Sequence, residues 1–305
     1  MFTPGTPDPL RAIAAMLAAA ALIAGTTILA KAIGQGVFGP ALHPLQVSQG
    51  RFAFAVLGLA AAAAVLRPRI ARPALALHAA RSVCGWAGVS LMFTAVVYIP
   101  LSDATAISFL NPVIGMILAI PLLGERVGPI RWSAAAIAFA GAVILLRPGG
   151  GVIQPGALFA LAAALALGLE AVFIKRLTGR EAPLQILIVN NAIGLAISTV
   201  AALFVWAAPT PAQWAALAGI GIAMVAAQAL FIQAMRAADA SFALPFFYTV
   251  LIFATLYDAA WFGTLPDAVS VAGAVVILAG ALLLAWREGR LTRAGRITTS
   301  AGSRS

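Results

Sequence analysis

The chain has 305 residues, of which 63% are hydrophobic and 9% are charged, and its mean hydropathy is +1.03. A chain this apolar has too little polar surface to cover a water-soluble domain, so the composition predicts a protein embedded in a bilayer. The net charge of +10 does not indicate nucleic-acid binding, because the cations are spread over alternate loops and are not gathered beside base-reading groups.

Ten apolar segments follow one another along the chain. A helix that crosses a membrane needs about 20 mostly apolar residues. The predicted spans are 11–34, 43–66, 76–98, 102–123, 131–147, 155–176, 184–207, 212–236, 242–262 and 268–286. The first is predicted to be an uncleaved helix, because its apolar core exceeds the roughly 7–15 residues of a secretory signal. Cys84 is the single cysteine, which excludes a disulfide within the chain.

Basic residues follow the second, fourth, sixth and eighth spans and fill the tail at 289–305, whereas the other loops carry little beyond Lys31 and Arg147. This positive-inside pattern places both termini, residues 1–10 and 289–305, in the cytoplasm. Seventeen arginines stand against two lysines, which suggests a GC-rich bacterial genome and hence the inner (cytoplasmic) membrane. Trp86 is the one tryptophan predicted to lie in the middle of a span.

An internal repeat links the two halves of the chain, predicted as 11–149 and 150–288. In each half an Asp–Ala pair is followed by a mid-span proline, Pro112 or Pro245, and then by a glycine, Gly141 or Gly280. Because five spans are an odd number, the second copy must enter the membrane in the opposite orientation. Inverted repeats of this kind are typical of secondary transporters, whose sites lie on interrupted helices near the midplane. We therefore expect Pro112 and Pro245 to act as hinges.

Two stretches carry a family resemblance. The segment LSDATAISFLNPVIGMILAIPLLGERVGP and its continuation to residue 149 resemble the end of an EamA domain of the drug/metabolite transporter (DMT) superfamily. Residues 243–288 resemble the second copy in the branch that includes S-adenosylmethionine uptake carriers. The ten-span layout is also similar to YddG-type aromatic amino-acid exporters. The sequence departs from the pattern at Thr264, where a glutamate is frequent, and at Asp258, where a small residue is common.

The resemblance implies an all-α integral membrane fold of two inverted five-helix repeats. In that fold spans three, four, eight and nine, with one and six, surround a central cavity, and spans five and ten lie outside. It also implies a small-molecule substrate and no cofactor.

The fourth span combines polar residues with a proline. Ser108, Asn111 and Gly115 fall at helical spacing on one face. Pro112 lacks a donor hydrogen, so the carbonyl one turn earlier needs another partner. An Asn–Pro pair therefore suits a helix that lines a wet cavity and contacts substrate. The alternative is a kink needed only for packing.

Further polar and aromatic residues are candidate substrate contacts. Polar groups inside a bilayer often mark transport pathways, but they also hydrogen-bond neighbouring helices. Aromatic rings can form the wall of a cavity or pack in the core. The candidates are Ser82, Trp86 and Ser90 in the third span, Gln228 in the eighth and Tyr248 in the ninth.

Four ionisable residues are predicted inside spans. Arg51 can offer a cation to a carboxylate, whereas Arg81 lies near enough to the cytoplasmic end to snorkel. Asp258 is a candidate for substrate contact. Asp258 and Glu170 are candidates for coupling to protons, although Glu170 can instead pair with a lysine or arginine that follows it.

Glycines on the fifth and tenth spans provide faces that permit close helix contact; they are Gly141, Gly273 and Gly280. Such faces can pack within one chain or between two chains. We expect packing within the chain, and therefore a monomer rather than a dimer.

Other classes of function fit less well. His43 and His78 are predicted near opposite membrane faces, so they cannot form a two-histidine metal site, and no catalytic set is evident. A channel usually assembles its pore from several subunits, which an inverted repeat does not require. We therefore predict a secondary carrier of small metabolites, most notably amino acids including aromatic ones, that works by alternating access, with export as the direction. The alternative is uptake of S-adenosylmethionine or a nucleoside-like solute.

Overall fold

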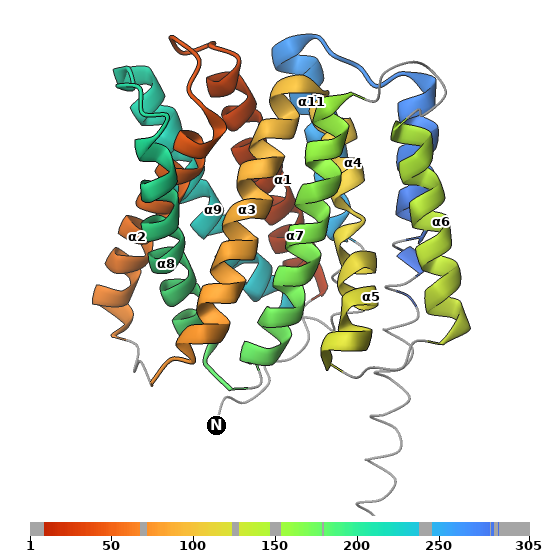
Figure 1. Cartoon of the computed structure of the whole chain (residues 1–305), viewed down its shortest axis with the longest axis horizontal. Coiled ribbons are helices and arrows are strands. Elements are labelled where there is room, and N and C mark those ends of the chain that lie inside the picture. The colour runs from red at the N-terminus through yellow and green to blue at the C-terminus, as the bar shows by residue number, and fades with distance from the viewer. Residues whose placement is uncertain are drawn as a thin grey trace, which may run out of the picture.

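The computed structural model describes residues 9–67, 72–123, 128–146, 154–178, 180–237, 246–280, 282–283 and 286. These residues form a bundle of helices that run up and down beside one another (Figure 1). The helices are α1 (Pro9–Gly34), α2 (Pro44–Leu66), α3 (Leu75–Tyr98), α4 (Leu101–Ser108), α5 (Asn111–Leu123), α6 (Pro129–Leu146), α7 (Pro155–Thr178), α8 (Pro183–Leu203), α9 (Pro211–Ala237), α11 (Val250–Phe262) and a further helix at Ala268–Gly280. Within the described residues, seven helical segments are long and apolar enough to cross a membrane.

Proline marks the beginning of most of these helices. Six of them, α1, α2, α6, α7, α8 and α9, have proline as their first residue. At that position the missing N–H has no helical partner to lose and the fixed φ already suits a helix. The same residue type that breaks a helix internally therefore separates one span from the next.

The span predicted at 102–123 is two helices and not one, with the interruption just before Pro112. Helix α4 ends at Ser108, a turn at 109–110 follows, and α5 begins at Asn111. In the turn the Phe109 N–H donates to the carbonyls of Thr105 and Ala106 at 3.2 and 3.1 Å. Pro112 is thus the second residue of α5, where a proline is tolerated. Pro245, the other predicted hinge, lies outside the described residues.

The two halves of the chain pack into each other instead of forming separate lobes. The most extensive contacts join α3 to α7 and α1 to α9, and each pair takes one helix from either half. Small residues permit the close approach: a Cβ at Gly88 would lie 2.7 Å from two side-chain atoms of Leu167. Helices in a bilayer associate through such contacts because lipid supplies no hydrophobic force between them.

Helix α6 stands at one edge of the bundle (Figure 1) and packs on the helix Ala268–Gly280. A Cβ at Gly141 would lie 2.6 Å from the backbone N of Ile277, and one at Gly280 would lie 2.6 Å from the backbone N of Ala138. The small-residue faces predicted on the fifth and tenth spans therefore meet each other within the chain.

Each end of the bundle has a buried polar residue after which it is called, Lys31 at one end and His78 at the other. The Lys31 end holds the last turns of α1 and α11 and the beginning of α4. The His78 end holds the first turns of α3 and α8 and the last turns of α2 and α7.

Candidate functional site

A charged cluster of Arg51, Arg81 and Glu170 lies inside the bundle, with one member each from α2, α3 and α7. Arg81 Nε and Glu170 Oε1 are 3.5 Å apart, and Arg81 Nη1 donates to the Ile186 carbonyl at 3.2 Å. The prediction that Arg81 snorkels to the surface is wrong, because its side chain is 7% exposed and contacts two helices of the second half.

Glycine makes room for the carboxylate of this cluster. A Cβ at Gly85 would lie 2.8 Å from Glu170 Oε1, so a side chain at this position would displace the carboxylate. Glu170 reaches across from α7 and lies against α3 at Gly85, the residue before Trp86. Ionised groups are costly inside a bilayer unless they are paired, and this packing gives Glu170 its ion pair.

Arg51 is the least satisfied member of the cluster. The residue is 6% exposed, and in the described part of the chain its Nε and Nη1 atoms have no hydrogen-bond partner. Its guanidinium carbon lies 4.6 Å from the centre of the Phe52 ring. It is also within electrostatic range of Glu170 and Arg81.

Trp86 lies at the depth of the cluster. The Ser90 hydroxyl donates to Ser48 Oγ at 3.0 Å, which fixes the register between the antiparallel helices α3 and α2. One turn nearer the His78 end, this register brings Trp86 on α3 level with Arg51 on α2. Trp86 Nε1 is buried and has no partner among the described residues.

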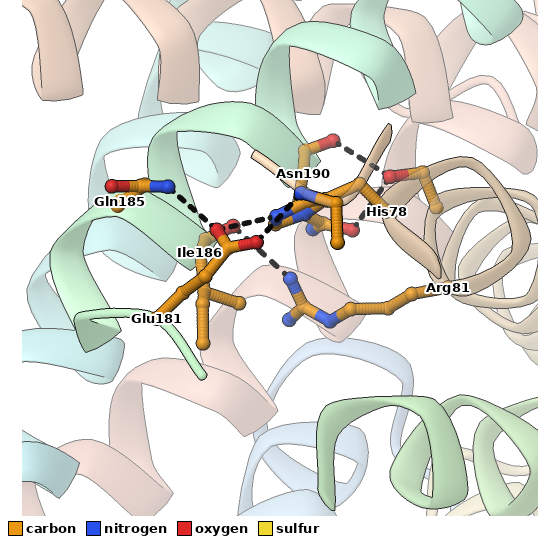
Figure 2. Close-up of polar contacts among 8 residues, drawn as sticks. His78, Arg81, Glu181, Gln185, Ile186 and Asn190 are labelled. Carbon is orange, nitrogen blue, oxygen red and sulfur yellow. Dashed lines mark hydrogen bonds and ion pairs between the residues drawn. The ribbon is translucent and has the colours of Figure 1, made fainter. Parts of the chain in front are cut away.

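A group of polar contacts at the His78 end joins α3 to the start of α8 (Figure 2). The Ala74 N–H donates to Glu181 Oε1 at 2.8 Å. His78 Nε2 lies 2.9 Å from Glu181 Oε2, and the Gln185 amide donates to Oε2 at 2.6 Å. These four residues are called the His78 latch below. It connects the first half of the chain to the second.

Burial opposes ionisation of Glu181, but the hydrogen bonds from Ala74, His78 and Gln185 outweigh it and lower the pKa of the carboxyl below its usual 4.5. A lowered folded-state pKa contributes stability above the unfolded-state pKa, and this contribution is lost as the pH falls through the folded-state value. We therefore expect acid to destabilise the wild type more than Glu181→Gln. Melting temperatures of both proteins from about pH 7 to about pH 3 check this; parallel curves would contradict it.

A second polar contact group lies at the Lys31 end. The Lys31 ammonium donates to Asp258 Oδ1, and the Leu101 N–H donates to Oδ2 at 2.7 Å. Lys31 also lies 4.6 Å from the centre of the Phe262 ring. The Asp258 side chain is 1% exposed. Lys31, Leu101 and Asp258 are called the Lys31 latch, and they too connect the two halves.

The pairing of Lys31 with Asp258 was not predicted. Lys31 was expected in a loop, and Asp258 was expected to contact substrate or to couple transport to protons. A signal was present, since each residue lies about one turn before the end of an apolar span and both ends were expected at the same membrane face.

Three predicted serines take part in ordinary helix contacts. Ser82 donates to Asn190 Oδ1 at 3.0 Å and so joins α3 to α8. Ser90 joins α3 to α2, and Ser108 donates to the Thr105 carbonyl of its own helix at 2.7 Å. The hydroxyls of Ser82 and Ser90 therefore join α3 to neighbouring helices, whereas that of Ser108 stays within its own helix.

The other predicted contact residues lie on α5, on α9 and in the turn before α11. Asn111 begins α5, and its carbonyl would lie 2.9 Å from a Cβ at Gly168, so this face of α5 packs on α7. Tyr248 meets the Phe109 ring edge-on, with ring centres 5.0 Å apart. Gln228 is half-buried on α9 and Pro112 is exposed.

A cleft of about 310 Å³ opens beside α11, at the Lys31 end. Its walls include Ile252 and Val275, which are more than half exposed, so it faces the side of the bundle and not the charged cluster. Within the described residues, no group of three or more His, Cys, Asp or Glu side chains is placed to hold a metal ion.

The apolar helices, the buried charges and the two latches define a multi-pass membrane protein with a polar interior. Comparison with known proteins assigns it further. The model of the EamA-like transporter family matches residues 10–147 and again residues 154–286. The chain belongs to this family, within the drug/metabolite transporter superfamily, and is a small-molecule transporter and not an enzyme.

Several curated bacterial proteins are similar to the chain. A riboflavin transporter from Rhizobium johnstonii is 32% identical over 71% of this chain and 72% of its own length. An S-adenosylmethionine uptake transporter from Rickettsia prowazekii is 25% identical over 82% of this chain and 85% of its own. The pseudopaline exporter CntI from Pseudomonas aeruginosa is 23% identical over 70% and 76%.

A solved crystal structure shares the fold. It is 21% identical in sequence and has a TM-score of 0.62, with 89% of this chain and 98% of that chain covered. At this level of identity the match concerns the architecture alone.

Proposed function

We propose that this transporter is a secondary carrier that moves small metabolites, foremost amino acids, by alternating access between the two sides of the membrane. The observation that carries the proposal is the pair of latches at opposite ends of the bundle, each joining the first half of the chain to the second. The charged cluster lies between them.

This arrangement supplies the parts that alternating access requires. A solute can reach the charged cluster from one end only if the contacts that join the halves at that end separate. The contacts at the other end must then hold, or the path would be a channel. A buried ion pair and a three-donor carboxylate site suit this role, because each has a closed state with its polar groups satisfied.

The distribution of charge supports an orientation. Arg67, Lys175, Arg176 and Arg180 are exposed near the His78 end, which the positive-inside rule assigns to the cytoplasm. In this orientation both termini are cytoplasmic, the Lys31 latch closes the outer side, and the membrane is the bacterial inner membrane. The halves that rock are 11–149 and 150–288, and the carrier acts as a monomer.

The residues of the cluster favour amino acids. A buried arginine can bind the carboxylate, and the indole of Trp86 can pack on an apolar or aromatic side chain. Export is proposed by analogy with amino-acid exporters of the same layout, and proton coupling is proposed to act through Glu170 or Asp258.

S-adenosylmethionine uptake is the second candidate. It is favoured by the relative from Rickettsia prowazekii, which covers more of this chain than the other two relatives above. S-adenosylmethionine has the same carboxylate and amino group as an amino acid, so it can use the same cluster. Because one relative is named as a riboflavin transporter, riboflavin is the third kind of solute to test.

The test is uptake of labelled tryptophan, phenylalanine, S-adenosylmethionine and riboflavin into proteoliposomes that contain the full chain, with and without a pH gradient. We expect saturable flux of an amino acid that is accelerated by the same unlabelled compound on the opposite side. Linear flux without counter-flow would indicate a channel and contradict the proposal. Movement of S-adenosylmethionine alone would select the second candidate.

A further inference from the structure

Arg51 has N–H donors that find no hydrogen-bond acceptor among the described residues. A guanidinium carries five N–H donors and stays protonated in proteins. The residue is only 6% exposed, yet its Nε and Nη1 atoms have no hydrogen-bond partner among the described residues. A buried cation in this condition is strongly unfavourable unless an anion approaches it.

A second unpartnered donor lies at the same depth. Trp86 Nε1 is buried without a hydrogen-bond acceptor in the described chain, and an indole can only donate. The Ser90–Ser48 hydrogen bond of 3.0 Å sets α3 against α2 so that Trp86 and Arg51 are level. Donors from two facing helices therefore lack an acceptor in the same layer of the bundle.

The charges of the cluster do not cancel. Arg51 and Arg81 are two cations, and Glu170 is one carboxylate that already pairs with Arg81 at 3.5 Å. Arg51 is within electrostatic range of both Arg81 and Glu170. One positive charge is left over. Arg81 Nε also lacks a hydrogen-bond partner among the described residues, but Arg81 has Glu170 as its ion-pair partner, which leaves Arg51 as the cation without one.

From these contacts we infer that Arg51 and Trp86 form a subsite for the carboxylate of a monoanionic or zwitterionic solute whose body is apolar or aromatic. This inference rests on the proposed function and names the group that the carrier recognises. A single carboxylate neutralises the remaining charge, whereas a phosphate monoester would add nearly two negative charges. The flat ring of Trp86 favours an organic body over a small inorganic ion.

The test measures binding apart from transport. The melting temperature of the purified full-length protein is followed with sodium indole-3-propionate, tryptamine hydrochloride or sodium chloride at equal ionic strength, since a ligand of the folded state raises it. We expect a saturable rise with indole-3-propionate and none with the other two. Arg51→Gln should raise the half-saturating concentration about 30-fold or more, and Trp86→Phe, which keeps a ring but loses the donor, about tenfold.

Arg51→Lys keeps the positive charge and replaces Arg51→Gln in the test if that variant does not fold. It should bind indole-3-propionate more weakly than the wild type does. An equal response to tryptamine overturns the subsite, and an equal response to chloride shows an inorganic anion instead of a carboxylate. An unchanged response in the Arg51 variants also overturns it. Flux of riboflavin, which has no carboxylate, in preference to amino acids would leave the carrier proposal standing in its general form and refute the subsite.

Discussion

Replacing Lys31 by methionine, or Asp258 by leucine, is expected to lower the free energy of unfolding by about 3–5 kcal/mol. Each change leaves one charged group buried without its partner, and that is the costly case for a buried ion pair. Asp258 keeps the Leu101 N–H as a donor at 2.7 Å, so Lys31→Met should be the milder of the two. Both variants should also lose most of their transport, because the Lys31 latch can no longer close.

The double variant Lys31→Met/Asp258→Leu separates the pair from its surroundings. With both charges gone no unpaired ion remains, so we expect the double variant to be clearly more stable than the sum of the single changes predicts. The measurement is a double-mutant cycle on thermal unfolding in one detergent. Additive effects would show that the two side chains do not depend on each other.

Thr255→Val is the matched control on α11. Thr255 lies one turn before Asp258, and its hydroxyl donates only to the Leu251 carbonyl of its own helix, at 2.9 Å. A hydroxyl bonded to its own helix in this way contributes little to stability. The control should therefore unfold almost as the wild type does.

Glu170→Gln is expected to have the second large effect, a loss of about 3–5 kcal/mol in the free energy of unfolding. The change keeps the shape of the side chain but removes its negative charge, so Arg81 and Arg51 are left as two like charges in electrostatic range. Transport should fall as well, because the cluster can no longer hold both cations in place.

Glu170→Asp provides the comparison for this prediction. It keeps the charge and withdraws it by one methylene, which lengthens the 3.5 Å approach to Arg81 Nε. We expect unfolding temperatures and flux between those of the wild type and Glu170→Gln. If Glu170→Gln were as stable as the wild type, the cluster would not depend on this carboxylate.

The positions of most helices follow from the sequence because apolar length is the dominant constraint in a bilayer. The span predicted at 76–98 is observed as Leu75–Tyr98, and that at 11–34 as Pro9–Gly34. An interruption near Pro112 was expected, but its form, a turn at 109–110 that separates two helices, was not predicted. A proline inside an apolar run is compatible with a kinked helix and with two helices, and only the contacts of the following turn decide between them.

The candidate site was harder to predict, because its contacts join residues that are distant in the chain. Lys31 and Asp258 are 227 positions apart, and His78 and Glu181 are 103 positions apart. Periodicity shows which face of a helix is polar but not which helix it meets. Ser82 illustrates the limit, since its place on a polar face was evident and its partner Asn190 was not.

The contact between α6 and the helix Ala268–Gly280 has a symmetry of its own. Gly141 approaches the backbones of Gly273 and Ile277, and Gly280 approaches those of Ala134 and Ala138. Gly273 and Ile277 precede Gly280 by the same numbers of residues as Ala134 and Ala138 precede Gly141. The two sides of an isologous interface have this reciprocal pattern. The twofold axis that relates these two helices therefore passes between Gly141 and Gly280. If the same axis relates the two halves of the chain, the two halves can exchange conformations without changing this contact, because the exchange only swaps its two equivalent sides. The contact between the two helices can then stay intact while the contacts at both ends of the bundle break and form.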